Sequence, residues 1–498
     1  MQIKLSAPPP DAIKADLIVL LVHSAESWND LRDDSLTQTV NDYREAAARK
    51  AVRDPLIWGG PALGGYKRQA GYWMLAPERI DRFPLGEQIK IAAARAIDYA
   101  RSLRLKKVAF LLNTRSGADR APEVVEGALL GGYRFEKYIT REKPNPPEIE
   151  LEILVAKDAL KTSQQALART RIVCDALNYA RDLANEPGSV LYPKILAGEA
   201  QSICRKTRLR CEILDEKQLK RKGYNGLLAV GRGSPHAPRL IVIGYKPRRP
   251  SPVHLALVGK GITFDTGGIN LKRTDDIWRM KGDMSGAAAV LATLRAIAQL
   301  APDIRVTGIL PAAHNAVGPN AVHPGDIIRA RNGKTIEIQN TDAEGRIILT
   351  DGLHRAGEEG ATHIVDVATL TGSCQRALGH AVAGLFSEDA DLNARILGAG
   401  AQVGENFWPL PLLDEYRELI KSAVADINNM PSSRNGGAIT AALFLREFVP
   451  PGIPWAHLDI AGTAFLEKDW KYFRKGATGS TTRTLIQLAT QDWDAAQS

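Results

Sequence analysis

The chain has 498 residues, more than one hydrophobic core usually serves, so we expect two domains with a substantial core in each. Hydrophobic residues make up 44% of the sequence and charged residues 24%, which is typical of globular proteins and excludes a disordered or fibrous chain. The net charge of +9 is diffuse, and we interpret the basic runs at 205–210, 217–222 and 246–249 as solvated faces, with nucleic-acid binding as the alternative.

Three features that the sequence lacks indicate where in the cell the protein is located. Only four cysteines occur and none forms a Cys-x-x-Cys pair, so we expect neither a disulfide framework nor a thiolate zinc site. The first 22 residues contain an apolar run broken by acids and prolines, unlike a secretory signal. No stretch approaches the roughly 20 apolar residues that cross a bilayer. We therefore expect a cytoplasmic protein with no membrane-spanning part.

The N-terminal part of the sequence alternates between strand-like and helical patterns. Residues 17–22 and 108–112 are apolar and strand-like, and residues 87–103 have a helical pattern. The run REKPNPP at 141–147 then interrupts the chain before a strand-like segment at 149–155. An α/β domain is predicted to close at this run.

A long helical pattern covers residues 162–183, with apolar residues at three- and four-residue steps, and predicts a linking helix. The alternation of strands and helices resumes after Pro187 and Gly188. The predicted elements are strands at 240–244, 253–258 and 305–312 and a helix at 286–300.

A hairpin is predicted next. The extended runs 327–330 and 335–338 flank Asn332-Gly333, and Asn-Gly between two such runs is a strong turn signal. The strand pair leads directly to Asn340.

These patterns together predict a mixed α/β fold with two domains. The smaller N-terminal accessory α/β domain covers residues 1–160, and a larger C-terminal domain covers residues 161–498, with a central mixed sheet flanked by helices.

Acidic residues beside glycines mark the chemistry of the second domain. Asp265 lies in GKGITFDTGG, Asp283 in RMKGDMSGAA, and Asp342 and Glu344 in NTDAEGR. Glycine lets the backbone bend so that carboxylates from distant segments converge, and Asp342 and Glu344 would project to one side of an extended segment. Each acid alone could be a helix cap or a turn residue, but together they predict a carboxylate-rich metal site. The two-histidine metalloprotease helix motif is absent.

At these residues the sequence resembles the leucine aminopeptidase family, the dinuclear cytosolic aminopeptidases. The octapeptide NTDAEGRI at 340–347 is similar to the family signature, with isoleucine for leucine at its end. The resemblance extends over 259–272, 280–289, 366–372, 425–429 and 455–462. The larger domain is therefore expected to be the catalytic metallopeptidase domain.

The resemblance implies two divalent metal ions, with Asp265 and Glu344 bridging them. The five implied metal ligands are Lys260, Asp265, Asp283, Asp342 and Glu344. Manganese or zinc is the expected metal, and magnesium or cobalt is compatible with the same ligands. Lys260 would bind as the neutral amine, which two nearby dications would allow by lowering its pKa. The alternative for Lys260 is a surface lysine after a strand.

Two cations, Lys272 and Arg346, fall where the family has catalytic groups. The resemblance implies that the paired metals supply an activated water and that Lys272 stabilises the developing oxyanion. It also implies that Arg346 holds a bicarbonate, which shuttles the proton, with help from the backbone of Ala343, Gly345 and Leu370. The implied function is a metal-dependent leucyl-type aminopeptidase that releases N-terminal amino acids from peptides with a free N-terminus.

The substrate pocket is also placed by resemblance. Met280, Thr369, Ala461 and Ala464 fall at or near family pocket positions and suggest an apolar pocket, with core packing as the alternative. The sequence leaves open whether leucine, methionine or a Cys-Gly dipeptide is preferred.

The chain departs from the family pattern at a few positions, none of them an implied ligand. Thr266 replaces a commoner serine, Gly282 a usual alanine and Ser285 a frequent glycine. The segment 314–323 matches the family pattern less closely but retains Asn315. Ser285 opens an apolar helical run, so we predict that it caps the helix. Cys374 is predicted to be buried rather than reactive.

Other functions are weaker interpretations. Gly398, Gly400 and Gly404 resemble a dinucleotide fingerprint, but no strand precedes them. No GxSxG elbow or phosphate-binding P-loop occurs. An additional DNA-binding or regulatory role is the main alternative, because some family members bind DNA. A silent structural hexamer is disfavoured by the presence of every key residue, and the resemblance implies a catalytic homohexamer.

Overall fold

The described part of the computed structural model comprises residues 1–7, 15–20, 57–60, 70–73, 83–111, 120–140 and 147–493, without 156, 158, 208, 274 and 276. All but the last residue of the predicted breaker run at 141–147 therefore lies outside the described residues. The chain divides into two compact units: unit 1 is Met1–Cys174 with Asp469–Arg474, and unit 2 is Asp175–Lys468 with Lys475–Ser498. The domain boundary at residue 160 stays a prediction.

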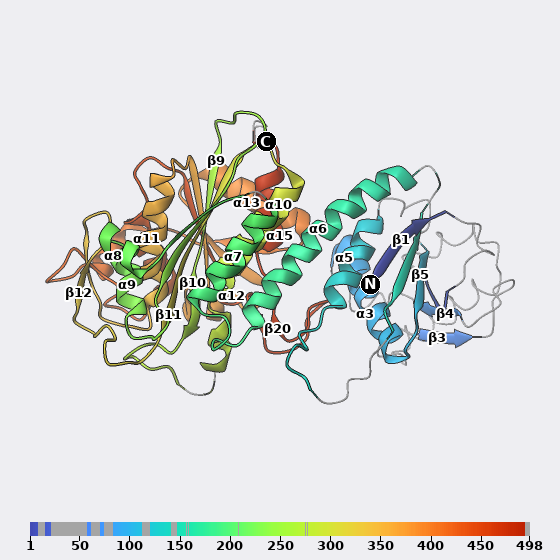
Figure 1. Cartoon of the computed structure of the whole chain (residues 1–498), viewed down its shortest axis with the longest axis horizontal. Coiled ribbons are helices and arrows are strands. Elements are labelled where there is room, and N and C mark those ends of the chain that lie inside the picture. Colours follow the sequence, from blue (N-terminus) through green and yellow to red (C-terminus); the bar gives the residue numbers. More distant parts are fainter. Residues whose placement is uncertain are drawn as a thin grey trace. The chain divides into compact units, whose positions relative to one another are not determined.

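Unit 1 is built on a parallel sheet with the strand order β1-β6-β5-β2, and β3 and β4 form an antiparallel hairpin. Helices α3 and α5 pack against each other (Figure 1). The elements are β1 (Gln2–Ser6), β2 (Leu17–Leu20), β3 (Ile57–Gly60), β4 (Ala70–Trp73), α3 (Leu85–Ser102), β5 (Lys107–Leu111), α5 (Ala121–Gly131) and β6 (Glu150–Leu154). The predicted helix at 87–103 and strands at 108–112 and 149–155 are confirmed as α3, β5 and β6.

Helix α6 (Leu160–Asn185) confirms the predicted linking helix at 162–183. Its residues up to Cys174 belong to unit 1, and those from Asp175 onward belong to unit 2.

Unit 2 contains a nine-stranded mixed sheet with the order β16-β15-β18-β14-β9-β11-β8-β7, in which β10 also pairs with β11. The central strands β18, β14, β9 and β11 are parallel, whereas β7, β8 and β15 introduce antiparallel pairs. The strands are β7 (Arg210–Leu214), β8 (Arg239–Tyr245), β9 (His254–Gly259), β10 (Gly261–Asp265), β11 (Arg305–Asn315), β14 (His363–Ala368), β15 (Val382–Phe386), β16 (Asn406–Pro409) and β18 (Trp455–Asp459). The predicted mixed α/β fold is confirmed.

Helices cover both faces of this sheet (Figure 1): α7, α10, α13 and α15 group on one face, and α9, α11, α12 and α14 on the other. Every residue of β9 is buried, as expected for a parallel strand between two helical layers. The helices are α7 (Pro193–Thr207), α8 (Glu216–Lys222), α9 (Asn225–Gly231), η4 (Ile277–Gly282), α10 (Ser285–Leu300), α11 (Glu344–Glu358), α12 (Gly372–Leu378), α13 (Ala390–Val403), η5 (Asp414–Ile420), α14 (Gly437–Arg446) and α15 (Thr482–Thr490).

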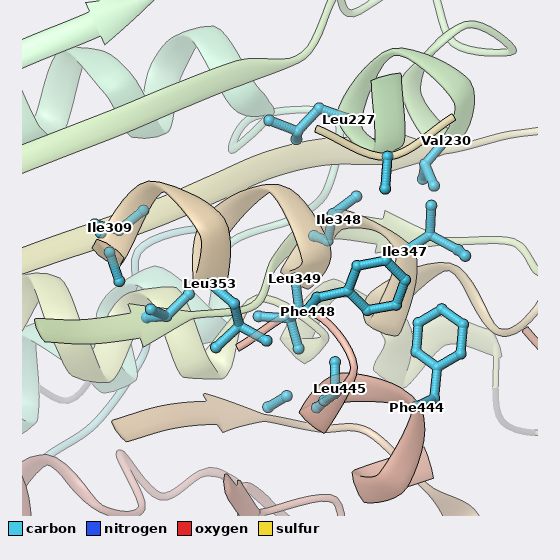
Figure 2. Packing of buried hydrophobic residues seen from close by; sticks show 14 of the residues in the cluster. Leu227, Val230, Ile309, Ile347, Ile348, Leu349, Leu353, Phe444, Leu445 and Phe448 are labelled. Carbon is cyan, nitrogen blue, oxygen red and sulfur yellow. The ribbon is translucent and has the colours of Figure 1, made fainter. Parts of the chain in front are cut away.

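The hydrophobic core on one face forms around α11 (Figure 2). Ile348 and Leu353 of α11, Ile309 of β11 and Phe444 of α14 belong to this one cluster, and all four are fully buried. Truncation of such a residue, as in Leu353→Ala, costs about 2–5 kcal/mol because the surrounding side chains cannot fill the cavity. This packing fixes the position of α11, whose first residue is Glu344.

Smaller strand pairs complete unit 2. The predicted hairpin is confirmed: β12 (Ile327–Arg329) pairs antiparallel with β13 (Thr335–Glu337), which also pairs with β17 (Ile427–Asn428). β19 (Phe465–Leu466) pairs with β20 (Gly476–Ala477). Among the described residues, no helix is both long enough and apolar enough to cross a membrane.

Candidate metal centre

The candidate site lies at the carboxyl ends of the parallel strands of unit 2. Lys260 directly follows β9, Asp265 is the last residue of β10, and the segment beginning at Thr369 follows β14. In open α/β sheets, ligands bind at this edge because the loops that leave neighbouring strands converge there. The fold therefore brings together segments that are about 100 residues apart in sequence.

The other predicted ligands come from a turn and a helix start. Asp283 lies between η4 and α10, and Glu344 is the first residue of α11, directly after its N-cap Ala343. The expectation that Asp342 and Glu344 share one side of an extended segment is wrong, because the chain turns at Asp342 and enters the helix. The turn itself brings the two carboxylates together.

Three carboxylates converge on one point. Asp265, Asp342 and Glu344 each offer an oxygen, and these oxygens all lie within 4.8 Å of one another. Asp265 and Glu344 are 2% and 3% exposed, so water screens their charges poorly. Asp283 joins the cluster through Lys260, whose Nζ lies 2.8 Å from Asp283 Oδ2 and 3.0 Å from Glu344 Oε1. The structure thus brings together all five predicted ligands.

Lys260 is fixed by the backbone as well as by carboxylates. Its Nζ donates to the carbonyl oxygen of Thr369 at 2.9 Å, and the hydroxyl of Thr369 donates to Asp283 Oδ1 at 2.7 Å. Gly345 makes room for this amine: a Cβ atom there would lie 2.5 Å from Lys260 Cε and 2.7 Å from Nζ. A side chain at position 345 would displace Lys260.

The loop after β10 orients Asp265. Its Oδ1 accepts from Asn315 Nδ2 at 2.7 Å and from the amide of Gly267 at 2.9 Å. Gly267 has φ +86°, a conformation that favours glycine, and its carbonyl accepts from the hydroxyl of Thr341 at 2.6 Å. This bond ties the loop to the turn that carries Asp342.

Lys272, the second predicted cation, also faces the carboxylates. Its Nζ lies 2.8 Å from Asp265 Oδ2 and contacts Asp342 Oδ1, and its side chain is 22% exposed at the rim. Burial alone would lower the pKa of Lys272, but the surrounding acids, led by Asp265, raise it above its ordinary value. The amine is therefore a permanent positive charge beside the acids.

The pKa values of the acids show how crowded their charges are. Burial, Glu344 and Asp283 raise the pKa of Asp265 well above its ordinary value, and burial raises that of Asp283 to about 6. Burial would also raise the pKa of Glu344, but Lys260 and Lys272 outweigh it and lower that pKa. The two lysines do not neutralise all four acids, so the cluster favours additional positive charge.

Arg346 lies in the first turn of α11 and is 6% exposed. Its Nη1 donates to the carbonyl oxygen of Asn429 at 2.9 Å, while its Nε is buried and has no hydrogen-bond partner among the described residues. Burial lowers the pKa of this guanidinium to about 10, against Glu344 and Asp459, which raise it. A buried guanidinium with an unused donor is suited to bind an anion.

The backbone groups predicted to assist Arg346 lie in two segments. Ala343 and Gly345 belong to the start of α11, where amides have no partner within the helix. The amide of Leu370 donates to Asp459 Oδ1 at 3.2 Å. Their role at an anion stays a prediction.

A cavity of about 210 Å³ opens beside the carboxylates. All four predicted pocket residues, Met280, Thr369, Ala461 and Ala464, line it, and Phe465 of β19 adds an aromatic wall. One end of the cavity is therefore charged, and part of its wall is apolar.

Three further predictions have clear outcomes. Ser285 is not the helix cap: it is the first residue of α10, and its hydroxyl donates to the carbonyl oxygen of Gly282 at 2.5 Å. Cys374 is buried, as predicted, and burial raises the pKa of its thiol. Gly398 and Gly400 lie inside α13 and not in a loop.

Sequence reasoning missed two residues that shape the site. The sequence places Thr341 in the signature octapeptide and Asp459 in a segment that resembles the family, but it predicts no role for either residue. Asp459 ends β18 with 1% exposure, next to the loop after β14. The signal that marks Asp265, an acid at the end of an apolar strand, also applies to Asp459.

Comparisons with known proteins agree with this geometry. A family model described as "Cytosol aminopeptidase family, catalytic domain" matches residues 178–486. A Solibacter usitatus protein named "Probable cytosol aminopeptidase" is 41% identical over 497 residues, covering 99% of this chain and 100% of that protein. A protein of the same name from Aquifex aeolicus is 47% identical over 365 residues, 73% of each chain.

Solved structures are similar over nearly the whole chain. A mutant of tomato leucine aminopeptidase superposes with a TM-score of 0.85 at 29% identity, covering 99% of this chain and 97% of that one. The bottromycin maturation enzyme BotP in complex with Mn gives a TM-score of 0.83 at 34% identity, covering 96% of this chain and 99% of that one. This chain belongs to the cytosol aminopeptidase family, a family of metal-dependent peptidases, and is an aminopeptidase of the leucyl type.

Proposed function

We propose that the chain removes the first residue from peptides with a free N-terminus, using two divalent metal ions held by Lys260, Asp265, Asp283, Asp342 and Glu344. The observation that carries the proposal is the uneven charge of the buried cluster. Four carboxylates meet two lysines there, and Glu344 Oε2 is buried without a hydrogen-bond partner among the described residues.

The donor set fits divalent ions. Carboxylate oxygens suit manganese, magnesium and zinc, and an amine nitrogen favours zinc, cobalt or manganese over calcium. A similar enzyme, BotP, has been solved in complex with Mn, which supports manganese. We infer manganese or zinc, with magnesium and cobalt compatible. Two bound ions would supply an activated water and polarise the scissile carbonyl.

The chain's own cations would complete the chemistry. Once metal ions neutralise the carboxylates, the ammonium group of Lys272 at the rim would stabilise negative charge that develops on the carbonyl oxygen. Its position beside Asp265 and Asp342 supports this role. Lys260 would instead serve as a neutral ligand, after losing its proton to solvent.

Arg346 would hold a bicarbonate together with backbone groups of Ala343, Gly345 and Leu370. Its unpartnered Nε, its burial and its position in the first turn of α11 support an anion there, because the positive end of the helix dipole favours negative charge. The bicarbonate would supply a shuttle for the proton that leaves the water.

The cavity supports a preference for apolar N-terminal residues. Met280, Ala461, Ala464 and Phe465 form apolar parts of its wall, so a leucine side chain would lose water there. The free α-amine of the substrate would be recognised at the metal centre, and a blocked N-terminus would lose this contact.

The partners and location stay proposals. We infer a homohexamer and a cytoplasmic protein from the family, whose members are named cytosol aminopeptidases. Additional DNA binding stays the alternative, although Arg210 and Lys222 of the basic runs pair with Glu212, and Arg210 also pairs with Glu359.

The test is hydrolysis of leucyl-p-nitroanilide by metal-stripped protein, before and after addition of Mn²⁺ or Zn²⁺, beside the N-acetylated substrate. We expect cleavage of the free-amine substrate only, restored by metal and lost in Glu344→Ala. Cleavage by the metal-stripped protein at the same rate, or equal cleavage of the acetylated substrate, would contradict the proposal.

A further inference from the structure

Asp459 is a buried acid outside the predicted ligand set. It is the last residue of β18, and 1% of it is exposed. Its carboxylate accepts hydrogen bonds from four neutral donors: the amides of Leu370 (3.2 Å), Thr371 (3.4 Å) and Ala461 (3.1 Å) reach Oδ1, and the hydroxyl of Thr371 (2.7 Å) reaches Oδ2. The Asp459 side chain thus binds two loops, one that contains Leu370 and Thr371 and one that contains Ala461.

The first of these loops, residues 369–371, leaves the neighbouring parallel strand. Ala368 at the end of β14 lies opposite Asp459, and the amide of Ile460 donates to the carbonyl oxygen of Ala368 at 2.9 Å. Thr371, held by Asp459, also caps α12, because its hydroxyl accepts from the amide of Cys374 at 3.0 Å. Both ends of the short loop are therefore fixed, one by strand pairing and one by Asp459.

Between these fixed ends lies Thr369, which touches two proposed metal ligands. Its carbonyl oxygen accepts from Lys260 Nζ at 2.9 Å, and its hydroxyl donates to Asp283 Oδ1 at 2.7 Å. A shift of the loop would move both bonds at once. Bonds of this kind set the orientation of ligand side chains, and their loss typically costs about 10–100-fold in metal affinity or activity.

We propose that Asp459 is a positioning residue for the metal centre, holding the 369–371 loop so that Thr369 orients Lys260 and Asp283. The inference rests on the proposed function, since it takes Lys260 and Asp283 as metal ligands. It adds a residue that touches neither ligand directly and acts through Thr369.

The chemistry of Asp459 supports this role over that of a simple strand end. Burying a carboxylate is costly unless hydrogen bonds replace its water, and here three amides and a hydroxyl do so. A carboxylate offers several acceptor sites on two oxygens, so it can collect amides that point from different directions. An uncharged side chain of the same size would bind fewer of these donors.

The decisive experiment titrates Mn²⁺ alone into metal-stripped full-length protein and follows binding by calorimetry. Asp459→Asn keeps the shape of the side chain but places an NH₂ group where an acceptor was. We expect about tenfold or greater weakening of Mn²⁺ binding. The matched control is Asp389→Asn in the same unit: Asp389 Oδ1 accepts from the amide of Leu392 at 2.8 Å at the start of α13. It should bind Mn²⁺ like the parent protein.

A double-mutant cycle separates positioning from loss of stability. Thr369→Val removes the hydroxyl that reaches Asp283. If Asp459 acts through Thr369, the affinity loss of the double variant is smaller than the product of the two single losses. If Asp459→Asn does not fold, Thr371→Val replaces it in the same cycle, because it removes the hydroxyl donor to Oδ2, together with the hydroxyl that caps α12.

Parent-like Mn²⁺ binding by Asp459→Asn would overturn the inference, as would independent losses in the cycle or an equal loss in Asp389→Asn. If the parent protein fails to bind Mn²⁺, both this inference and the proposed function fall. If the parent binds and cleaves while Asp459→Asn matches it, this inference alone falls.

Discussion

Unit 1 and unit 2 each bury a cluster of acidic and basic side chains, and the clusters differ in their balance of charge. In unit 1, Glu87 lies between two lysines, with Lys90 Nζ at 3.1 Å and Lys471 Nζ at 2.9 Å, and Lys90 also reaches Glu126 at 3.0 Å. Among the described residues, this cluster has two acids and two lysines. The cluster in unit 2 has four acids and two lysines.

The difference separates a structural cluster from a site. In a buried cluster whose charges are paired, removing one partner leaves an uncompensated charge. An acid-rich cluster keeps unused oxygens, such as Glu344 Oε2, and holds pKa values such as that of Asp265 away from their ordinary range. Surplus charge of one sign marks the place where a ligand of the other sign is expected.

The largest expected effect is on activity. Asp265→Asn should lower kcat/KM for leucyl-p-nitroanilide by at least about 10³-fold, because a proposed bridging carboxylate is lost. The melting temperature of the metal-free protein should not fall, since the raised pKa of Asp265 shows that its charge is disfavoured there. Kinetics and calorimetry on the same preparation check both parts. A large drop in melting temperature would show that the acid cluster is as structural as that of unit 1.

The reverse pattern is expected in unit 1. Glu87→Gln should destabilise the protein by about 3 kcal/mol, because Lys90 and Lys471 would each lose a buried ion pair. Chemical denaturation followed by circular dichroism measures this. Glu152→Gln is the control, since Glu152 pairs with the exposed Lys4 at 3.6 Å. An unchanged free energy of unfolding for Glu87→Gln would contradict a structural role for the cluster in unit 1.

Substrate preference tests the apolar wall of the same site. Ala464→Met would fill part of the cavity and disfavour leucine relative to alanine at the substrate N-terminus by about 1–3 kcal/mol, while leaving metal binding intact. The ratio of kcat/KM for leucyl- and alanyl-p-nitroanilide measures this. An unchanged ratio would place the side-chain pocket elsewhere.

The smallest effect concerns another buried acid, Asp351 of α11, for which burial outweighs the influence of Arg331 on the pKa. Its Oδ2 accepts from the amide of Leu227 at 2.8 Å, its Oδ1 has no hydrogen-bond partner among the described residues, and burial raises its pKa to about 7 from an ordinary 3.8. The folded state thus favours the neutral carboxyl, so this stabilising contribution is complete below about pH 4 and is lost as the pH rises through 7.

Asp351→Asn stays neutral at every pH and should therefore reduce the loss of melting temperature between pH 5 and pH 8, by a few degrees. Scanning calorimetry at the two pH values gives the comparison, with the exposed Glu216→Gln as control. An equal pH dependence in parent and variant would mean that Asp351 does not titrate in this range.

Much of this architecture was predictable from local patterns. The alternation of strand-like and helical patterns predicted α3, α6, α10, β9 and β11, and Asn332-Gly333 predicted the hairpin β12–β13. The acids beside glycines gave the cluster of Asp265, Asp342 and Glu344, since glycine permits the turns that bring them together.

What could not be predicted depends on contacts between distant segments. Thr369 touches Lys260 and Asp283 because β14 lies beside β9, and Asp459 meets the loop at 369–371 because β18 lies beside β14. Strand order and register are tertiary facts that residue patterns within one segment do not contain. Two local predictions were wrong. The chain turns at Asp342 and enters α11 instead of continuing as an extended segment, and α10 begins at Ser285 itself, one residue earlier than predicted.

The two lysines beside the acids have a consequence for how the protein takes up metal. Lys260 and Lys272 act as internal counterions of the acid cluster. On the proposed function, Lys260 would hold a metal ion as the neutral amine, after giving its proton to solvent, and Lys272 would no longer be needed as a counterion of the carboxylates. Metal loading would thus release protons and be opposed by acid.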